Sequence, residues 1–341
     1  MPLIEAIQLR KVFRRPDKRP GLAGSLRHLV ERKYTDKLAV DDIDLTIEAG
    51  EAVAYVGPNG AGKSTTVKML TGVLVPTSGT VRVEGRVPYQ DRIANARRIG
   101  VVFGQRTQLW WDLPVRDSLN LLADMHGLSA AQYAANLERL DATLGLAEIL
   151  PVMARKLSLG QRMRADLAAA LVHNPPIVFL DEPTIGLDIA VKDRVRVFVR
   201  QLVDEGTTVM LTTHDLGDIE DICKRLVIID DGRIVYDGDL RTVVDTYARE
   251  RTMHFEVART PSSLAGIAAR LPRAAVRDGH SDLQLDVAFD PSLVSAAEVL
   301  AAVQAEVDVV DIRIDEPTIE DVVRRMYAGE LRPGTEPGAA G

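Results

Sequence analysis

Residues 57–64 read Gly-Pro-Asn-Gly-Ala-Gly-Lys-Ser, between an apolar run that ends at Val56 and a segment with helical spacing. This run matches the phosphate-loop pattern G-x-x-x-x-G-K-[ST]. Glycines let successive backbone N–H groups converge on phosphate oxygens, and the start of a helix adds the positive end of its dipole. In such a loop Lys63 reaches the β and γ phosphates and Ser64 offers a hydroxyl to Mg²⁺. An ordinary glycine-rich turn is the alternative, but the strand–loop–helix context favours a nucleoside triphosphate site.

A second strand end carries two adjacent carboxylates. The apolar run 177–180 is followed by Asp181 and Glu182. At the carboxyl end of a parallel strand the first carboxylate faces the phosphate loop and holds Mg²⁺, while the second orients or deprotonates the attacking water. Solvated strand ends also carry acidic pairs, but the upstream loop favours the catalytic interpretation. We therefore predict Glu182 as the general base.

Three further polar features are weaker when each is taken alone. Gln105 follows a predicted strand at 99–103, His214 follows a predicted strand at 208–212, and Leu-Ser-Leu-Gly-Gln at 157–161 precedes a helix. An amide or imidazole at a strand end can reach a metal, a water or a phosphate, and Ser158 is placed to cap the helix. Taken alone, each of these residues more often has a structural role. Their order along the chain is therefore more informative than any one of them.

In chain order, the phosphate loop, Gln105, residues 157–161, the acidic pair, Asp188 and His214 form the series of ATP-binding cassettes. Over about residues 3–240 the sequence resembles the nucleotide-binding subunit of an ABC transporter. The resemblance implies an ATPase, since no member of the series is substituted. It assigns catalysis to Lys63, Gln105, Glu182 and His214, Mg²⁺ to Ser64, Gln105 and Asp181, and ATP to Gly57, Pro58, Asn59, Gly60, Ala61, Gly62, Lys63, Ser64 and Thr65.

The resemblance also implies a head-to-tail dimer that encloses two ATP molecules. Each ATP then lies between the phosphate loop of one copy and the signature of the other, with Asp188 in the D-loop. Donors at the helix start near Ser158 and Gly160 would meet the γ-phosphate of the partner's ATP. We therefore expect the chain to pair with itself, through the signature residues Leu157, Ser158, Leu159, Gly160 and Gln161.

The residue that stacks on adenine has two candidates. Family members place an aromatic side chain shortly before an Ala-Val-Asp segment, here residues 39–41. Phe13 follows the usual strand, whereas Tyr34 has the usual spacing to Ala39. A basic insertion at 14–37 separates the two, so both remain open, with Phe13 preferred.

The alternation of strands and helices predicts an α/β fold, and the resemblance implies a P-loop NTPase cassette at 1–245, followed by a smaller domain. The cassette combines a mixed sheet with a parallel core, an antiparallel β subdomain and a helical subdomain at about 112–175. After it, the order strand, helix, strand, strand, helix, strand predicts a C-terminal accessory α+β domain at 246–328. The tail 329–341, rich in Gly, Pro and Ala, is expected to be disordered.

The composition limits the compartment and the partners that we expect for the chain. No apolar run approaches the 18 or so residues of a membrane span, and the N-terminus lacks the pattern of a secretory signal. One cysteine, Cys223, fits a reducing compartment, and the net charge of −7 argues against nucleic acid. We expect a cytoplasmic protein, bound to the inner face of the cell membrane through separate integral-membrane permease subunits.

Two segments bear on the permease. In the resemblance, Trp110 and Trp111 stand where family members contact their permease, although a role in the core is equally open. Residues 316–323 resemble the C-terminal segment of cassettes that serve ABC-2 type exporters. The resemblance favours export of a drug-like, lipid or polysaccharide substrate. Residues 14–37 hold eight basic and three acidic side chains in an otherwise acidic chain. This segment is either a solvated loop or a contact with the permease or anionic lipid.

Two other classes of ATP-binding protein share parts of this pattern. The first is a non-transport ABC ATPase. Members of DNA repair have a long coiled coil before the signature, but residues 64–156 hold no sustained heptads. Translation-associated members carry two cassettes in one chain, whereas this sequence holds one. An ATP-sensing regulatory module that does not hydrolyse ATP would not need Glu182 and His214. Both alternatives are disfavoured by these features.

Overall fold

The computed structural model describes residues 2–16, 34–104, 106–213, 217, 219–220, 222–247, 251–259, 263–279, 281–315 and 319–327. The chain divides into two compact units, Met1–Asp237 and Gly238–Gly341.

The first unit is built on a six-stranded sheet with the order β5-β6-β7-β3-β8-β9. Neighbours from β5 to β8 are parallel, and β3, β6 and β7 are buried along their whole length, as strands are when both faces of a sheet are covered. The strands are β3 (Ala52–Val56), β5 (Ile99–Phe103), β6 (Ile177–Asp181), β7 (Thr208–Thr213), β8 (Arg225–Asp230) and β9 (Arg233–Asp239).

The register of the parallel strands prepares one edge of this sheet for chemistry. Phe103 pairs with Asp181, Asp181 with Thr212, and Thr212 with Tyr55, so the four residues form a row across the carboxyl end. The loops that follow four different strands therefore leave from the same edge. Ligands of open parallel sheets bind at such an edge.

An antiparallel sheet, β2-β1-β4, completes the strands of the first unit. Its strands are β1 (Ile4–Pro16), β2 (Tyr34–Ile47) and β4 (Ser78–Val83), and β1 stays paired with β2 as far as Pro16 and Tyr34. Both strands are longer than their alternating pattern predicts, because pairing continues into charged residues that solvate well at a sheet end. The basic insertion 14–37 thus begins and ends in strand. The spacing of Leu22, Leu26 and Leu29 predicts a short amphipathic helix within it, and these residues lie outside those described.

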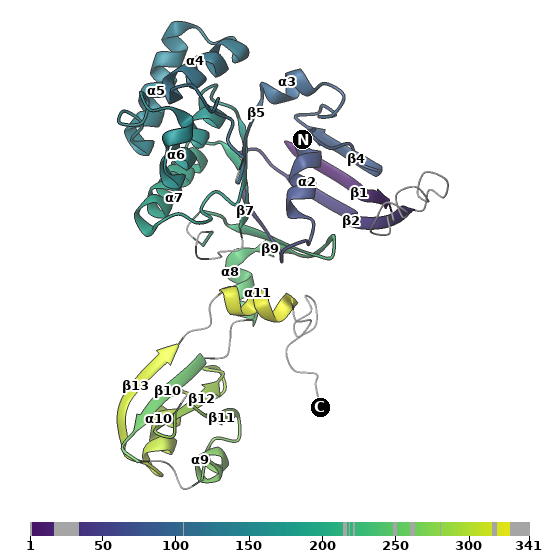
Figure 1. The fold of residues 1–341 in the computed structure, drawn as a ribbon. Helices are drawn as coiled ribbons and strands as arrows, with labels where there is room; N and C mark the ends of the chain where they lie inside the picture. Colours follow the sequence, from purple (N-terminus) through teal and green to yellow (C-terminus); the bar gives the residue numbers. More distant parts are fainter. Residues whose placement is uncertain are drawn as a thin grey trace, which may run out of the picture. The chain divides into compact units, whose positions relative to one another are not determined.

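Helices α4 to α7 lie together on one side of the six-stranded sheet, and α2 lies on the other side with β1, β2 and β4 (Figure 1). The expected helical subdomain 112–175 holds α4, α5 and α6, joined by a short 3-10 turn, η1. The helices are α2 (Lys63–Leu70), α3 (Arg92–Ala96), α4 (Val115–His126), α5 (Ala130–Leu144), η1 (Ala154–Lys156), α6 (Leu159–Leu171) and α7 (Ile189–Asp204).

The second unit contains an antiparallel sheet with the order β11-β12-β10-β13, whose core includes Phe255, Leu285 and Val299. From β10 to β13 its elements run strand, helix, strand, strand, helix, strand, with α8 before them and α11 after them. Helix α10 begins at Ala296, because its N-cap Ser295 forms a capping box with Glu298. The elements are α8 (Leu240–Tyr247), β10 (Arg251–Val257), α9 (Ala265–Arg270), β11 (Ala274–Asp278), β12 (Gln284–Phe289), α10 (Ala296–Gln304), β13 (Val309–Asp315) and α11 (Ile319–Tyr327).

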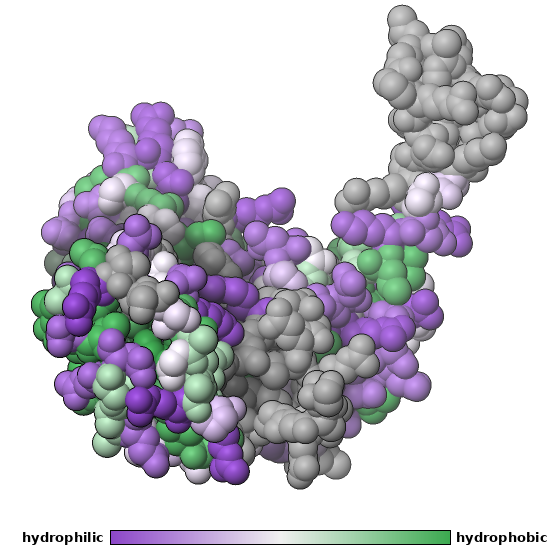
Figure 2. All heavy atoms as spheres, turned by 90° about the horizontal axis from the view of Figure 1, so that it is seen from below, coloured by the Kyte–Doolittle hydropathy of each residue, from purple (hydrophilic) through white to green (hydrophobic). Residues whose placement is uncertain are grey.

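Within the described ranges, no helix combines the length and the apolar character needed to cross a bilayer. On the face drawn in Figure 2, hydrophobic residues are interrupted by hydrophilic ones.

Candidate nucleotide-binding site

The phosphate loop is packed against neighbouring strands at two of its glycines. A Cβ atom at Gly57 would lie 2.3 Å from the carbonyl oxygen of Ile229, and one at Gly62 would lie 2.5 Å from that of Ala39. Gly60, with φ +90°, has open space around its missing Cβ among the described residues. The sequence therefore needs glycine at 57 and 62 for close packing, and at 60 for a left-handed backbone on the open side of the loop.

Lys63 opens helix α2 and lies inside the loop. Its side chain is 6% exposed, and Nζ donates to the carbonyl oxygens of Gly57 (2.6 Å) and Pro58 (3.3 Å). Burial lowers the pKa of Lys63, and the carboxylates of Glu182 and Asp181 oppose that shift. The ammonium group thus contacts carbonyl oxygens that phosphate oxygens can replace.

A cavity of about 340 Å³ joins the loop to the end of β6. It is lined by Ser64 of α2, by Asp181 and Glu182, and by Gly104 and Arg106 on either side of Gln105. The structure therefore brings together residues that lie far apart in sequence. Gln105 and His214 lie outside the described residues, so their expected roles stay predictions from the sequence.

The side-chain oxygen atoms that line this cavity are suitable ligands for Mg²⁺. A hydroxyl from Ser64 and a carboxylate from Asp181 are the hard oxygen ligands that Mg²⁺ prefers. Across the described ranges, no group of three or more His, Cys, Asp or Glu side chains is arranged to hold an ion by itself. In phosphoryl-transfer proteins, one or two carboxylates usually hold Mg²⁺ together with substrate phosphates.

Thr212 is a residue of this site that the sequence patterns miss. It is fully buried on β7, and its Oγ1 donates to Asp181 Oδ1 at 2.5 Å. The amide of Glu182 donates both to Thr212 Oγ1 (3.2 Å) and to the Thr212 carbonyl (2.9 Å). Because φ of Glu182 is +54°, a value rare outside glycine, these bonds hold the turn that directs the Glu182 side chain. The available signal was a hydroxyl side chain directly after the apolar run 209–211, near the end of the strand.

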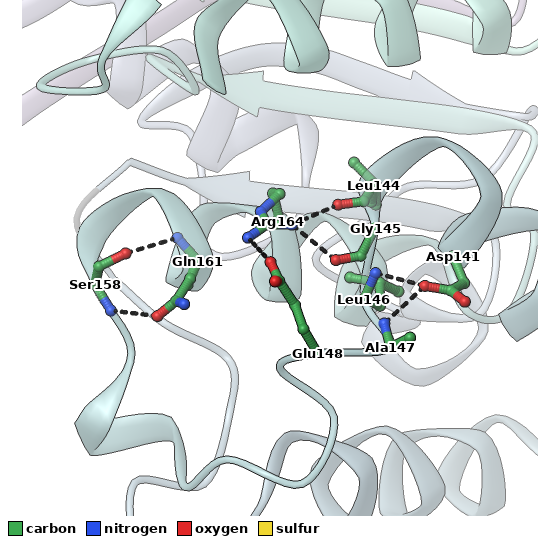
Figure 3. Close-up of polar contacts among 9 residues, drawn as sticks. All are labelled: Asp141, Leu144, Gly145, Leu146, Ala147, Glu148, Ser158, Gln161 and Arg164. Carbon is green, nitrogen blue, oxygen red and sulfur yellow. Dashed lines mark hydrogen bonds and ion pairs between the residues drawn. The ribbon is translucent and has the colours of Figure 1, made fainter. Parts of the chain in front are cut away.

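The signature segment begins helix α6 with a capping box, which confirms Ser158 as its N-cap. Gln161 N donates to Ser158 Oγ (3.3 Å), and Ser158 N donates to Gln161 Oε1 (3.0 Å) (Figure 3). Three residues further on, Arg164 donates to the carbonyl oxygens of Leu144 (2.9 Å) and Gly145 (2.7 Å) at the end of α5. The start of α6 is therefore fixed both locally and against α5.

Gly160 of the signature packs against helix α7. A Cβ at Gly160 would lie 3.0 Å from Val191 Cγ2, and one at Gly186 would lie 3.1 Å from Leu159 Cδ2. Asp188 caps α7, since Val191 N donates to its Oδ1 at 2.9 Å. Signature and D-loop thus pack together within one chain, and neither is among the residues that line the Ser64–Asp181 cavity.

Helix α6 also holds the segment that follows Gln105. Asp166 is 4% exposed and accepts from Thr107 Oγ1 (2.8 Å) and Gln108 N (2.9 Å). Burial raises the pKa of Asp166, while these two bonds act in the opposite direction. The signature helix and the chain after Gln105 are therefore joined through one buried carboxyl group.

The two adenine candidates differ in their place along the antiparallel sheet. Phe13 pairs with Lys37, whereas Tyr34 pairs with Pro16, further from the point where Ala39 and Val40 meet Gly62 of the loop. Lys11 Nζ lies 5.3 Å from the centre of the Phe13 ring. At about 3.3 Å per strand residue, Tyr34 is five residues, or roughly 17 Å, from Ala39 along β2.

Comparison with known proteins agrees with this geometry. Residues 40–185 match the model of the family described as ABC transporter. The chain is 32% identical to the daunorubicin resistance ATP-binding protein DrrA3 of Streptomyces coeruleorubidus, over 89% of this chain and 95% of the relative. It is 38% identical to a Nod factor export ATP-binding protein I of Burkholderia thailandensis, over 64% of this chain and 71% of the relative.

Solved structures give the same fold. An ATP-binding subunit of an ABC transporter superposes with a TM-score of 0.60 at 26% identity, covering 71% of this chain and 92% of that one. A dimeric ATP-binding cassette bound to ADP and Pi superposes with a TM-score of 0.59 at 24% identity, covering 70% of this chain and 99% of that one, and shows the fold alone. With its phosphate loop and acidic pair in one cavity, the chain belongs to the ATP-binding proteins of ABC transporters.

Proposed function

We propose that this protein is the ATP-hydrolysing subunit of an ABC-2 type exporter and drives a separate membrane permease. The observation that carries the proposal is the cavity that Ser64, Asp181 and Glu182 share beside Lys63. Export is supported by the names of relatives, which include a daunorubicin resistance protein and a Nod factor export protein. Amphiphilic drug-like, lipid or saccharide molecules are the corresponding substrate class.

The roles of the residues follow from their chemistry. Lys63 and the amides of residues 57–65 bind the phosphates of ATP, and Glu182 orients and deprotonates the attacking water, with His214 contacting the γ-phosphate. Ser64, Asp181 and Gln105 would hold Mg²⁺, which would supply positive charge that offsets the charge of the phosphates. Thr212 fixes the carboxylate of Asp181 and the backbone of Glu182 in place before ATP arrives, which reduces the reorganisation needed for reaction.

A homodimer completes the site. The signature is capped and anchored but does not line the Ser64–Asp181 cavity of its own chain, so its donors are available to the ATP of a second copy. The cassette structure similar in fold is described as dimeric. Head-to-tail pairing then gives Leu157–Gln161 and Asp188 their functional role.

Phe13 is the proposed adenine platform. It lies on β1 opposite Lys37, close to the β2 residues that contact the phosphate loop, whereas Tyr34 is 53% exposed at the far end of the hairpin. A Phe13→Ala variant should raise KM for ATP, and Tyr34→Ala should not.

Contacts with the membrane complex complete the proposal. Trp110 and Trp111 are 40% and 50% exposed, and the Arg162 guanidinium lies 4.7 Å from the Trp111 ring. Such rings suit a protein interface. We assign them to the permease, place the protein at the inner face of the cell membrane, and propose that the basic segment 14–37 adds contact with anionic lipid.

Glu182→Gln tests the enzymatic proposal, because it removes the general base and keeps the size of the side chain. Purified wild type with Mg²⁺ and ATP should hydrolyse ATP, and the variant should bind ATP without turnover and accumulate as a dimer on size-exclusion chromatography. A variant that hydrolyses ATP as fast as wild type would refute the assignment of Glu182. A wild type that stays monomeric under all nucleotide conditions would refute the dimer.

A further inference from the structure

The turn between β8 and β9, residues 231–232, is hydrogen-bonded to the phosphate loop. Gly232 donates its backbone N–H to the carbonyl oxygen of Ala61 at 2.9 Å. Ala61 C=O and Gly62 N–H belong to one trans peptide unit, in which these two groups point in opposite directions. The bond from Gly232 therefore directs the Gly62 N–H away from the turn. In a phosphate loop, such backbone N–H groups bind the phosphates.

The turn is in turn held by strand β2. Asp41 N donates to the carbonyl oxygen of Gly232 at 2.8 Å. Gly232 has φ +80°, and a Cβ atom there would lie 3.1 Å from Val40 Cα, so this position needs glycine for both its conformation and its close contact. One chain of backbone hydrogen bonds thus runs from Asp41 of β2 through Gly232 to Ala61 of the phosphate loop.

The carboxylate of Asp41 binds the same turn a second time. Arg233, the residue after Gly232, donates to Asp41 Oδ2 from Nε (2.8 Å) and from Nη2 (2.5 Å). Arg10 Nε lies 3.4 Å from Asp41 Oδ1. Asp41 is only 7% exposed, and a carboxylate buried to this degree needs charged or hydrogen-bonding partners. Asp41 therefore holds the turn both through its backbone N–H and through its side chain.

An irregularity in β2 turns Asp41 towards the interior. Between residues 40 and 43, β2 holds one residue more than β1 does between residues 9 and 11. Asp42 has φ +58° at this point. Val40 and Asp41 are consecutive and both buried, which the regular alternation of a strand does not produce. A bulge redirects a side chain in this way, so the local backbone of β2 brings the Asp41 carboxylate to Arg233.

We propose that Asp41 and Arg233 are positioning residues for the phosphate loop. Neither is among the residues that line the Ser64–Asp181 cavity. Their ion pair fixes the β8–β9 turn, the turn holds the Ala61 carbonyl, and the Gly62 N–H is thereby directed for a phosphate before the nucleotide arrives. Donors that are already in place lower the cost of binding. The inference rests on the proposed function, because it takes residues 57–65 as the site that binds the phosphates.

The affinity of full-length variants for nucleotide tests the proposal. The probe is a fluorescent ADP with Mg²⁺, which the loop binds through phosphates and which is not hydrolysed. The Arg233 side chain is 71% exposed, so Arg233→Met should fold, but it loses both bonds to Asp41 and its Kd should rise about three- to tenfold. Arg233→Lys keeps the positive charge and should recover part of the affinity. Asp41→Asn should weaken binding to a similar degree, and the double variant Asp41→Asn/Arg233→Met should bind about as well as either single variant, because both act through one pair.

Arg225→Met is the matched control. Arg225 lies at the other end of β8 and β9 from the turn, where it donates to Asp237 Oδ1 (2.7 Å) and to Glu51 Oε1 (3.0 Å). Its side chain is 24% exposed, against 71% for Arg233. Arg225→Met should therefore lower the free energy of unfolding more than Arg233→Met does, but it should leave the Kd for fluorescent ADP unchanged.

Hydrogen exchange gives a second measure that needs no nucleotide. The Gly232 amide should exchange faster in Arg233→Met and Asp41→Asn than in wild type, and close to the wild-type rate in Arg225→Met. Single variants that bind fluorescent ADP like wild type, losses of affinity that multiply in the double variant, or unchanged exchange at Gly232 would each overturn the proposal and leave the proposed function intact. A wild type that binds no nucleotide would overturn the proposed function, and this inference with it.

Discussion

Replacing Thr212 by Val tests whether the catalytic pair is held in place before ATP binds. Val keeps the branched shape of Thr but removes the hydroxyl that donates to Asp181 Oδ1 at 2.5 Å and accepts from Glu182 N at 3.2 Å. The stronger Glu182 N bond to the Thr212 carbonyl, at 2.9 Å, remains. The change therefore loosens Asp181 and the Glu182 turn without removing a ligand of the site.

The size of the effect follows from the bond to the carboxylate. A hydrogen bond to a charged group contributes about 1.5–3 kcal/mol. If the variant loses this contribution in the transition state, turnover falls about 10- to 100-fold, since 1.36 kcal/mol corresponds to tenfold in rate. KM for ATP should change little, because the contacts of Lys63 within the phosphate loop do not involve Thr212.

Thr208→Val is the matched control. Thr208 is a buried threonine at the other end of the same strand, and its Oγ1 accepts from Gly50 N at 2.8 Å. Both variants lose a buried hydroxyl, so both should be less stable, but only Thr212→Val should lose turnover and need more Mg²⁺ for nucleotide binding in a fluorescence titration. Thr212→Ser should recover both. Equal turnover in Thr212→Val and Thr208→Val would refute the positioning role.

Two further predictions concern stability. Arg164→Met leaves two carbonyl oxygens at the end of α5 without their donor, so the free energy of unfolding should fall by about 2–4 kcal/mol in urea titrations, and Arg164→Lys should lose less. His173 stacks on His126 with ring centres 3.7 Å apart, and burial, together with His126, lowers the pKa of His173 to about 4. The unfolded chain binds a proton at His173 more tightly than the folded chain does. The contribution of His173 to the free energy of unfolding is therefore complete above about pH 6.5 and is lost as pH falls towards 4. The His173→Asn variant should show a flatter dependence of this free energy on pH when denaturation is measured at several pH values.

The sequence predicted the parts of this protein that short motifs encode. Strand–loop–helix context placed Lys63 and Ser64, and an apolar run placed Asp181 and Glu182 at a strand end, because both patterns are local. Thr212 escaped prediction because its role depends on which strand lies beside β6, and the pairing of β6 with β7 is a property of topology.

The same distinction explains the antiparallel sheet. Alternation of apolar and polar residues marks the buried part of β1 and β2, as at Ile4, Leu9 and Ile43. Beyond it, pairing up to Pro16 and Tyr34 rests on backbone hydrogen bonds, which leave no trace in hydropathy.

The glycine at position 160 has two possible explanations, one from the sequence and one from the structure. The sequence interpretation places Gly160 at the helix start that receives the γ-phosphate of the partner's ATP. In the structure, a Cβ at this position would lie 3.0 Å from Val191 Cγ2 of the same chain. At that distance the valine must shift by a few tenths of an ångström, so Gly160→Ala should cost a modest amount of stability.

A double-mutant cycle with Val191→Ala distinguishes the two roles. Removing the γ carbons of Val191 relieves the contact. In a Val191→Ala background, Gly160→Ala should therefore cost little or no stability. We expect ATP hydrolysis to stay low in the double variant, because a methyl group still stands at the helix start where the γ-phosphate of the partner's ATP is received. Hydrolysis restored by Val191→Ala would mean that Gly160 serves packing against α7 alone, and that the donors of the signature tolerate a side chain there.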